Sequence, residues 1–153
     1  MEAYLAPDGR LQSELALRDA QSGFAGVTAE VWQVAPDGTW RVTRDLEGRE
    51  IAPERTGDLS PEQLAGLARV LSSQDFRSLP AELGAKAEVN ARQLTLRFGE
   101  ATMILNLMPG EELDQAACAA APRSELRRFA EIVQAIMHTL REEGGGATIQ
   151  CMN

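Results

Sequence analysis

Hydrophobic and polar residues alternate along several stretches of this chain, and the alternation predicts β-strands. In residues 12–19, Leu15 and Leu17 face one side, while Glu14 and Arg18 face the other. A period of two residues is typical of a strand with one buried face. We therefore expect a first strand here, with its leucines toward the core.

The clearest predicted hairpin joins residues 27–34 to residues 39–46 through a three-residue loop at 36–38. Cross-strand pairing in that register predicts three facing pairs: Val34 with Trp40, Trp32 with Val42, and Glu30 with Arg44. One face of the hairpin is then aromatic and aliphatic and is closed by an ion pair. Both tryptophans are therefore expected in the core, although tryptophan is also typical of surface binding hot spots.

A second hairpin is predicted over residues 94–107. Apolar residues occupy alternate positions on both sides of Gly99-Glu100. A two-residue turn with glycine first is a common hairpin connection, so we expect the turn at these two residues.

Two amphipathic helices are predicted from their start signals and apolar stripes. Ser60 fits the N-cap, Pro61 the first helical position and Gln63 the partner in a capping box. Ser124 fits the cap of a final helix that ends before Gly144. The stripes consist of Leu64, Leu67, Ala68 and Leu71 in the first helix, and of Leu126, Phe129, Val133, Ile136, Met137 and Leu140 in the last.

These elements predict an α+β fold, with a mostly antiparallel sheet of four to five strands and two amphipathic helices on one face. We expect a single domain over residues 13–143. It follows an N-terminal extension and turn at residues 1–12, and it precedes a flexible tail at residues 144–153. Residues 47–58 are charged and residues 109–123 are acidic and alanine-rich, so both stretches are expected to be loops.

The charge of the chain narrows the choice of partner. The 153 residues carry a formal net charge of −8, which suits neither the phosphates of a nucleic acid nor an anionic membrane surface. No apolar run approaches the ~18 residues that cross a bilayer, and residues 1–8 do not resemble the start of a signal peptide. We expect a protein partner and, unless a leader has been removed, a cytoplasmic location.

The residues that carry enzyme chemistry form no recognisable site. His138 is the only histidine, and it falls off the apolar stripe of the last helix, so we expect it to be solvated. Cys118 and Cys151 are expected as free thiols in a loop and in the tail. Together these three residues are too few for a structural zinc site, and no glycine-rich phosphate cradle occurs. We therefore expect no enzyme, no cofactor and no metal, and the sequence singles out no catalytic residue.

Three short motifs occur along the chain in an informative order. They are Ser22-Gly23-Phe24-Ala25-Gly26, the helix start Leu59-Ser60-Pro61-Glu62-Gln63-Leu64 and the run Asp75-Phe76-Arg77-Ser78-Leu79-Pro80, with a strand pair and a terminal helix after them. In this order the chain resembles the emfourin-like family over roughly residues 13–142. The family consists of small bacterial proteins, and its namesake inhibits thermolysin-type zinc metalloproteases. The resemblance therefore implies a protease inhibitor, although Ser22 replaces an expected glycine and no inhibitory residue can be carried over.

The sequence leaves several functions open. An inhibitor must insert a rigid loop into the protease cleft, and the candidates are residues 45–58, 84–92 and 108–123, because the turn at 99–100 is too tight to reach far. The alternative is an accessory or regulatory subunit of a larger complex with no protease partner. An enzyme using a Glu/Asp pair, as glycosidases do, predicts a deep pocket with carboxylates of perturbed pKa. We expect a monomer or a weak homodimer, the latter through an exposed sheet edge.

Overall fold

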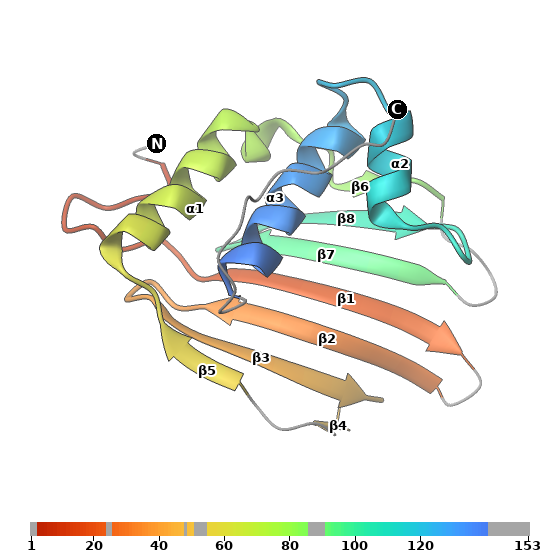
Figure 1. Cartoon of the computed structure of the whole chain (residues 1–153), viewed down its shortest axis with the longest axis horizontal. Helices are drawn as coiled ribbons and strands as arrows, with labels where there is room; N and C mark the ends of the chain where they lie inside the picture. The colour runs from red at the N-terminus through yellow and green to blue at the C-terminus, as the bar shows by residue number, and fades with distance from the viewer. Residues whose placement is uncertain (1–2, 24–25, 48, 51–54, 86–90, 141–153) are drawn as a thin grey trace.

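The computed structural model describes residues 3–23, 26–47, 49–50, 55–85 and 91–140. Within these ranges a single sheet is covered on one face by three helices (Figure 1). The helices are α1 (Pro61–Ser73), α2 (Leu113–Ala119) and α3 (Glu125–Thr139), with a short 3₁₀ helix η1 (Phe76–Ser78) after α1. The fold is therefore α+β, as the sequence predicts, with one helix more than expected.

The sheet contains eight strands among the described residues, against the four to five expected. Its order is β4-β3-β2-β1-β7-β8-β6, and β5 pairs with β3. The long strands are β1 (Leu15–Gly23), β2 (Gly26–Val34), β3 (Thr39–Leu46), β7 (Arg92–Phe98) and β8 (Ala101–Leu107); the short ones are β4 (Arg49–Glu50), β5 (Arg55–Asp58) and β6 (Glu82–Leu83). Every pairing is antiparallel except that of β6 with β8, so the sheet is mixed.

The predicted hairpins form in the predicted registers. In the β2–β3 hairpin Val34 faces Trp40, Trp32 faces Val42 and Glu30 faces Arg44. Both tryptophans are buried, at 6% and 7% exposure, so the core interpretation is confirmed. The β7–β8 hairpin turns at Gly99-Glu100 and pairs Phe98 with Ala101.

Strand β1 is the centre of the sheet, since it pairs with β2 on one side and with β7 on the other. It is longer than the alternating pattern indicates and runs on to Gly23, where it faces Gly26 at the start of β2. The glycine-flanked motif is thus the turn of a third hairpin, whose tip, residues 24–25, lies outside the described residues. Pairing of β1 with β7 joins the two predicted hairpins into one sheet.

Two stretches expected to be loops contain regular structure instead. Residues 47–58 include β4 and β5, which both pair with the edge strand β3. Residues 109–123 include α2, whose Leu113 and Ala117 are buried one helical turn apart, at 5% and 0% exposure. The alanine content of this stretch favours a helix once a core is available to cover that pair.

The expectation of free thiols is wrong for Cys118. This residue lies on α2, not in a loop, and it is disulfide-bonded. The other cysteine of the chain, Cys151, lies outside the described residues, as does the expected tail at 144–153.

Both long helices begin as their sequences predict. The Ser60 side chain accepts a hydrogen bond from the Gln63 backbone N–H, and the Gln63 side chain accepts one from the Ser60 backbone N–H, which completes the capping box. Ser124 caps α3 by accepting from the Arg127 backbone N–H. Their apolar stripes meet the strands in one core, in which Phe76, Phe98 and Phe129 are the largest fully buried side chains.

The residues before β1 are packed against this core. Tyr4 is 5% exposed and its ring makes edge contacts with Phe76 and Phe98, at centroid distances of 6.5 and 5.4 Å.

Two Ala-Pro-Asp-Gly turns lie side by side, joined by a hydrogen bond from the Leu11 N–H to the Pro36 carbonyl. In the second turn the Thr39 backbone N–H donates to Asp37, which lowers the pKa of that carboxyl below its usual value. Each turn closes with a glycine at positive φ, Gly9 and Gly38, a conformation that glycine adopts without strain.

Candidate functional site

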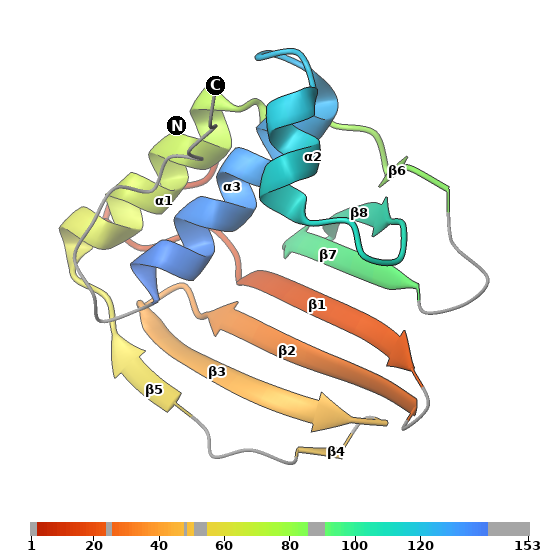
Figure 2. The same cartoon turned by 45° about the vertical axis from the view of Figure 1, so that its right-hand side comes forward.

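The helix-facing side of the sheet changes from apolar to polar partway along its strands. On β1 the inward positions run Leu15, Leu17, Asp19, Gln21, and on β2 the facing positions run Val34, Trp32, Glu30, Thr28. The apolar half lies beneath α1 and α3, and the polar half extends beyond them (Figures 1 and 2). The fold therefore leaves the polar half of this face open to a partner.

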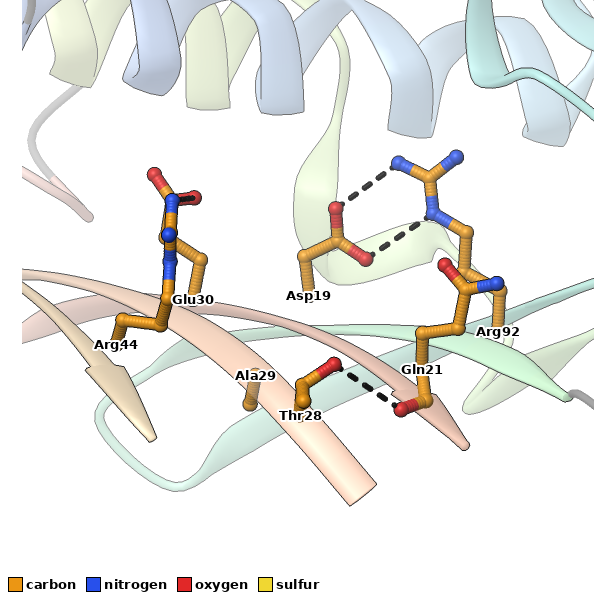
Figure 3. A pocket seen from close by; sticks show the side chains of 7 residues that line it. All are labelled: Asp19, Gln21, Thr28, Ala29, Glu30, Arg44 and Arg92. Carbon is orange, nitrogen blue, oxygen red and sulfur yellow. Dashed lines mark hydrogen bonds and ion pairs between the residues drawn. The ribbon is translucent and has the colours of Figure 1, made fainter. Parts of the chain in front are cut away.

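This open polar area is hollowed, with a volume of about 450 Å³. We call it the polar shelf, and it is lined by Asp19, Gln21, Thr28, Ala29, Glu30, Arg44 and Arg92. Figure 3 shows the charged side chains of the shelf rising from the strands toward the helices.

The centre of the polar shelf is a two-point ion pair. Arg92 donates through Nε to one oxygen of Asp19 at 3.1 Å and through Nη2 to the other at 2.9 Å. Both side chains are mostly covered, at 22% and 19% exposure. Because the Asp19 carboxylate accepts both hydrogen bonds, the pKa of the Arg92 guanidinium is raised above its usual value and the guanidinium stays charged. These two hydrogen bonds fix the orientation of both side chains, so the centre of the shelf is rigid.

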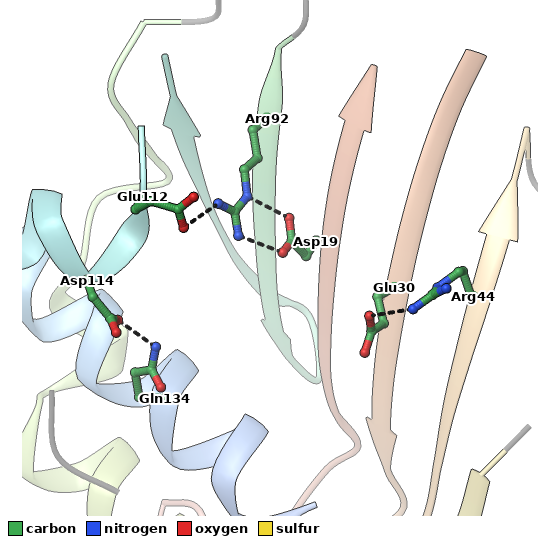
Figure 4. A network of polar contacts seen from close by, with 7 residues as sticks. All are labelled: Asp19, Glu30, Arg44, Arg92, Glu112, Asp114 and Gln134. Atoms are coloured by element: carbon green, nitrogen blue, oxygen red, sulfur yellow. Dashed lines mark hydrogen bonds and ion pairs between the residues drawn. The ribbon is translucent and has the colours of Figure 1, made fainter. Parts of the chain in front are cut away.

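Further charges extend from this pair in both directions across the shelf (Figure 4). Arg92 also lies 3.9 Å from Glu112, the exposed residue that precedes α2. On the other side Arg44 lies 3.7 Å from Glu30, so the ion pair predicted at the end of the tryptophan hairpin is confirmed. Together with the adjoining Glu112, the shelf thus presents three carboxylates and two guanidinium groups, spaced over four strands and the start of α2.

All three candidate loops leave the sheet at the end where the polar shelf lies. Residues 45–58 continue from the end of β3, residues 84–92 lead into the start of β7, and residues 108–123 follow the end of β8. The glycine-flanked hairpin between β1 and β2 turns at the same end. The sequence does not predict this convergence, because it depends on the antiparallel pairing of β1 with both β2 and β7.

A second hollow of about 450 Å³ lies between the ends of α1 and α3, beside Arg123 and Arg128. Here the Arg128 guanidinium donates to the backbone carbonyls of Gln74 and Asp75, at 2.8 and 2.9 Å, and to the Ser78 hydroxyl at 2.6 Å. Arg128 therefore caps the carboxyl end of α1 and holds η1 in place, so this hollow has a structural explanation.

Histidine, cysteine and acidic side chains are the groups that enzyme and metal chemistry most often use. The described residues contain no cluster of three or more His, Cys, Asp or Glu side chains able to hold a metal ion. His138 is half-buried rather than solvated, and its Nε2 is shielded from solvent without a hydrogen-bond partner in the described part of the chain. Nor is any helix among the described residues long and apolar enough to cross a bilayer.

The comparisons with known proteins add no relative. No family model matches the chain, and no curated protein matches it either. The resemblance to the emfourin-like family therefore stays a prediction that rests on the three motifs.

Proposed function

We propose that this protein is a non-catalytic protein-binding domain that inhibits a thermolysin-type metalloprotease. The observation that carries the proposal is that the strand ends leading into the three candidate segments, and into the glycine-flanked hairpin, converge around the polar shelf. A protease inhibitor must hold the segments that occupy the active-site cleft on a rigid support. Their backbone then cannot move into the geometry that the catalytic residues need for cleavage. The antiparallel sheet and its two-point ion pair provide such a support.

The chemistry of the polar shelf suits a protein surface better than a small molecule. Small-molecule sites are enclosed and mainly apolar, whereas the shelf is open and five of its seven lining residues have charged or amide side chains. Charges arranged in alternating sign over a surface of this kind select a partner by electrostatic complementarity. We therefore assign the shelf and the strand ends around it to the partner-binding surface.

The competing function is that of an accessory or regulatory subunit of a larger complex without a protease partner. Such a subunit would use the same surface, since protein binding alone does not require a cleft-filling loop. A cytoplasmic location also stays a prediction, and the disulfide of Cys118 favours an oxidising compartment instead.

The decisive experiment is an inhibition assay with the purified protein. A thermolysin-type protease and a fluorogenic peptide substrate are incubated with rising concentrations of the chain, from nanomolar to tens of micromolar. We expect cleavage to fall in a saturable way while the chain stays intact on a gel. Full cleavage at micromolar chain, with the chain itself degraded, would contradict the proposal and leave the accessory-subunit function.

A further inference from the structure

The face of the sheet that points away from the helices is uncovered by any described element (Figures 1 and 2). We call it the open face. Its positions alternate with those of the core, so β1 contributes Ala16, Arg18 and Ala20. The neighbours of these residues on β2 and β7 are Gln33, Val31, Ala29, Arg97, Thr95 and Gln93. Seven of these nine side chains are uncharged; Ala20 and Ala29 are buried, at 6% and 4% exposure, whereas Arg18 is exposed.

Most charged side chains of the open face are paired within the chain. Arg97 donates to Glu14 at 2.8 Å, and Glu82 accepts from Asn106 at 2.7 Å. Asp58 accepts from the Thr39 hydroxyl at 3.5 Å, and Arg41 also has a partner. Each of these groups thus has a partner within the chain, although the Nε of Arg41 is buried without a hydrogen bond among the described residues.

Arg18 and Asp45 differ from these groups, because neither has a polar partner among the described residues. Arg18 is exposed and stands between Val31 and Thr95 on the adjacent strands. Asp45 lies on β3, opposite Ala29, and is half-exposed. Among the described side chains, Arg18 and Asp45 are thus two charges of opposite sign on the open face that have no polar partner within the chain.

The spacing of these two charges makes the open face complementary to itself. Arg18 on β1 is level with Thr43 on β3, which lies two strand spacings away, and Asp45 is two residues further along β3. The Cα atoms of Arg18 and Asp45 are therefore roughly 12 Å apart. Consider a dimer whose two-fold axis lies in the plane of the interface, passes midway between Arg18 and Asp45, and is perpendicular to the line that joins them. This axis places Arg18 of each copy opposite Asp45 of the other copy. The point midway lies over β2, at Ala29 and Val31. Packed sheets are about 10 Å apart, a gap that an arginine and an aspartate side chain together can bridge.

We propose that the open face is a homodimer interface in which Arg18 of each copy pairs with Asp45 of the other. The five long strands offer a face of roughly 24 by 23 Å, which places the contact at the small end of stable interfaces. We accordingly expect dissociation in the micromolar range. The charged side chains of the polar shelf lie on the opposite side of the sheet, so such a dimer presents two shelves and leaves their charged groups accessible.

Sedimentation equilibrium from 1 to 200 µM chain tests the dimer. The wild type is expected to move from 16.6 kDa toward twice that mass as its concentration rises. Because each substitution removes two pairs per dimer and creates two repulsive ones, Arg18→Asp and Asp45→Arg should each raise the dissociation constant at least tenfold. The double variant, which exchanges the two charges, should restore the dimer.

Arg69→Asp is the matched control, since it changes the charge equally on the exposed side of α1 and should leave the dimer unaffected. Circular dichroism confirms folding, and Arg18→Gln and Asp45→Asn serve if a reversed charge prevents it. A wild type that stays at monomer mass up to 200 µM overturns the proposal. So does a folded double variant that is as monomeric as its parents. Neither outcome affects protease inhibition, which rests on the other face.

Discussion

Replacing Phe129 by alanine is expected to cost the largest share of stability of any change considered. Phe129 lies on α3 with 0% exposure, within the core that joins the helices to the sheet. Removing a fully buried phenylalanine ring loses its transfer free energy and leaves a cavity, which together cost about 3–5 kcal/mol. Because domains of this size have only about 5–15 kcal/mol in total, the variant should approach the limit of folding.

Chemical denaturation monitored by tryptophan fluorescence measures this loss, since Trp32 and Trp40 report on the same core. Met108→Ala is the control, because Met108 is 55% exposed and its truncation should change the free energy of unfolding by less than about 0.5 kcal/mol. A loss below about 1 kcal/mol for the Phe129 variant, with the control unchanged, would show that α3 does not pack as described.

Replacing Arg128 by alanine should produce the second-largest effect. Three hydrogen bonds from one guanidinium end at the last turn of α1 and at η1, and two of them satisfy backbone carbonyls. Hydrogen bonds that involve a charged group contribute more than neutral ones, so we expect a loss of about 2–3 kcal/mol. One of the two carbonyls belongs to Asp75, whose backbone is strained at a φ of +50°. Loss of the hydrogen bond from Arg128 would leave this conformation less well supported.

Arg128→Lys provides a graded test of that explanation. Lysine keeps the charge but cannot reach three acceptors with one planar group, so it should recover only part of the loss. Arg69→Ala, on the exposed side of α1, should be close to wild type in a thermal or urea titration. Equal stability of the Arg128→Ala variant and the wild type would contradict the capping role.

The local part of this fold could be predicted from the sequence. The capping box at Ser60 and the Gly99-Glu100 turn each depend on a few adjacent residues. The Glu30–Arg44 pair at the edge of the polar shelf follows from one hairpin register. These features were predicted correctly because each depends on residues no more than about fifteen positions apart.

The remaining features depend on contacts between distant parts of the chain. Strands β4, β5 and β6 contain two to four residues each and exist only because β3 and β8 offer edges to pair with. Helix α2 has seven residues, too few to be stable without the core that covers Leu113. The central pair of the shelf joins Asp19 to Arg92, which are 73 residues apart, so no local pattern could reveal it.

The most direct test of the partner-binding surface is to obstruct the polar shelf and measure protease inhibition. Thr28 is exposed on β2 and lines the shelf, so a tryptophan at this position should fill part of the hollow without entering the core. Thr102→Trp makes the same change at the opposite end of the sheet, on the exposed start of β8. Both variants are compared with the wild type against one thermolysin-type protease, after circular dichroism has confirmed folding.

We predict that Thr28→Trp raises the inhibition constant at least tenfold, while Thr102→Trp leaves it within twofold of the wild type. Equal inhibition by both folded variants, or no inhibition by the wild type, would contradict the assignment of the polar shelf as the surface that binds a protease.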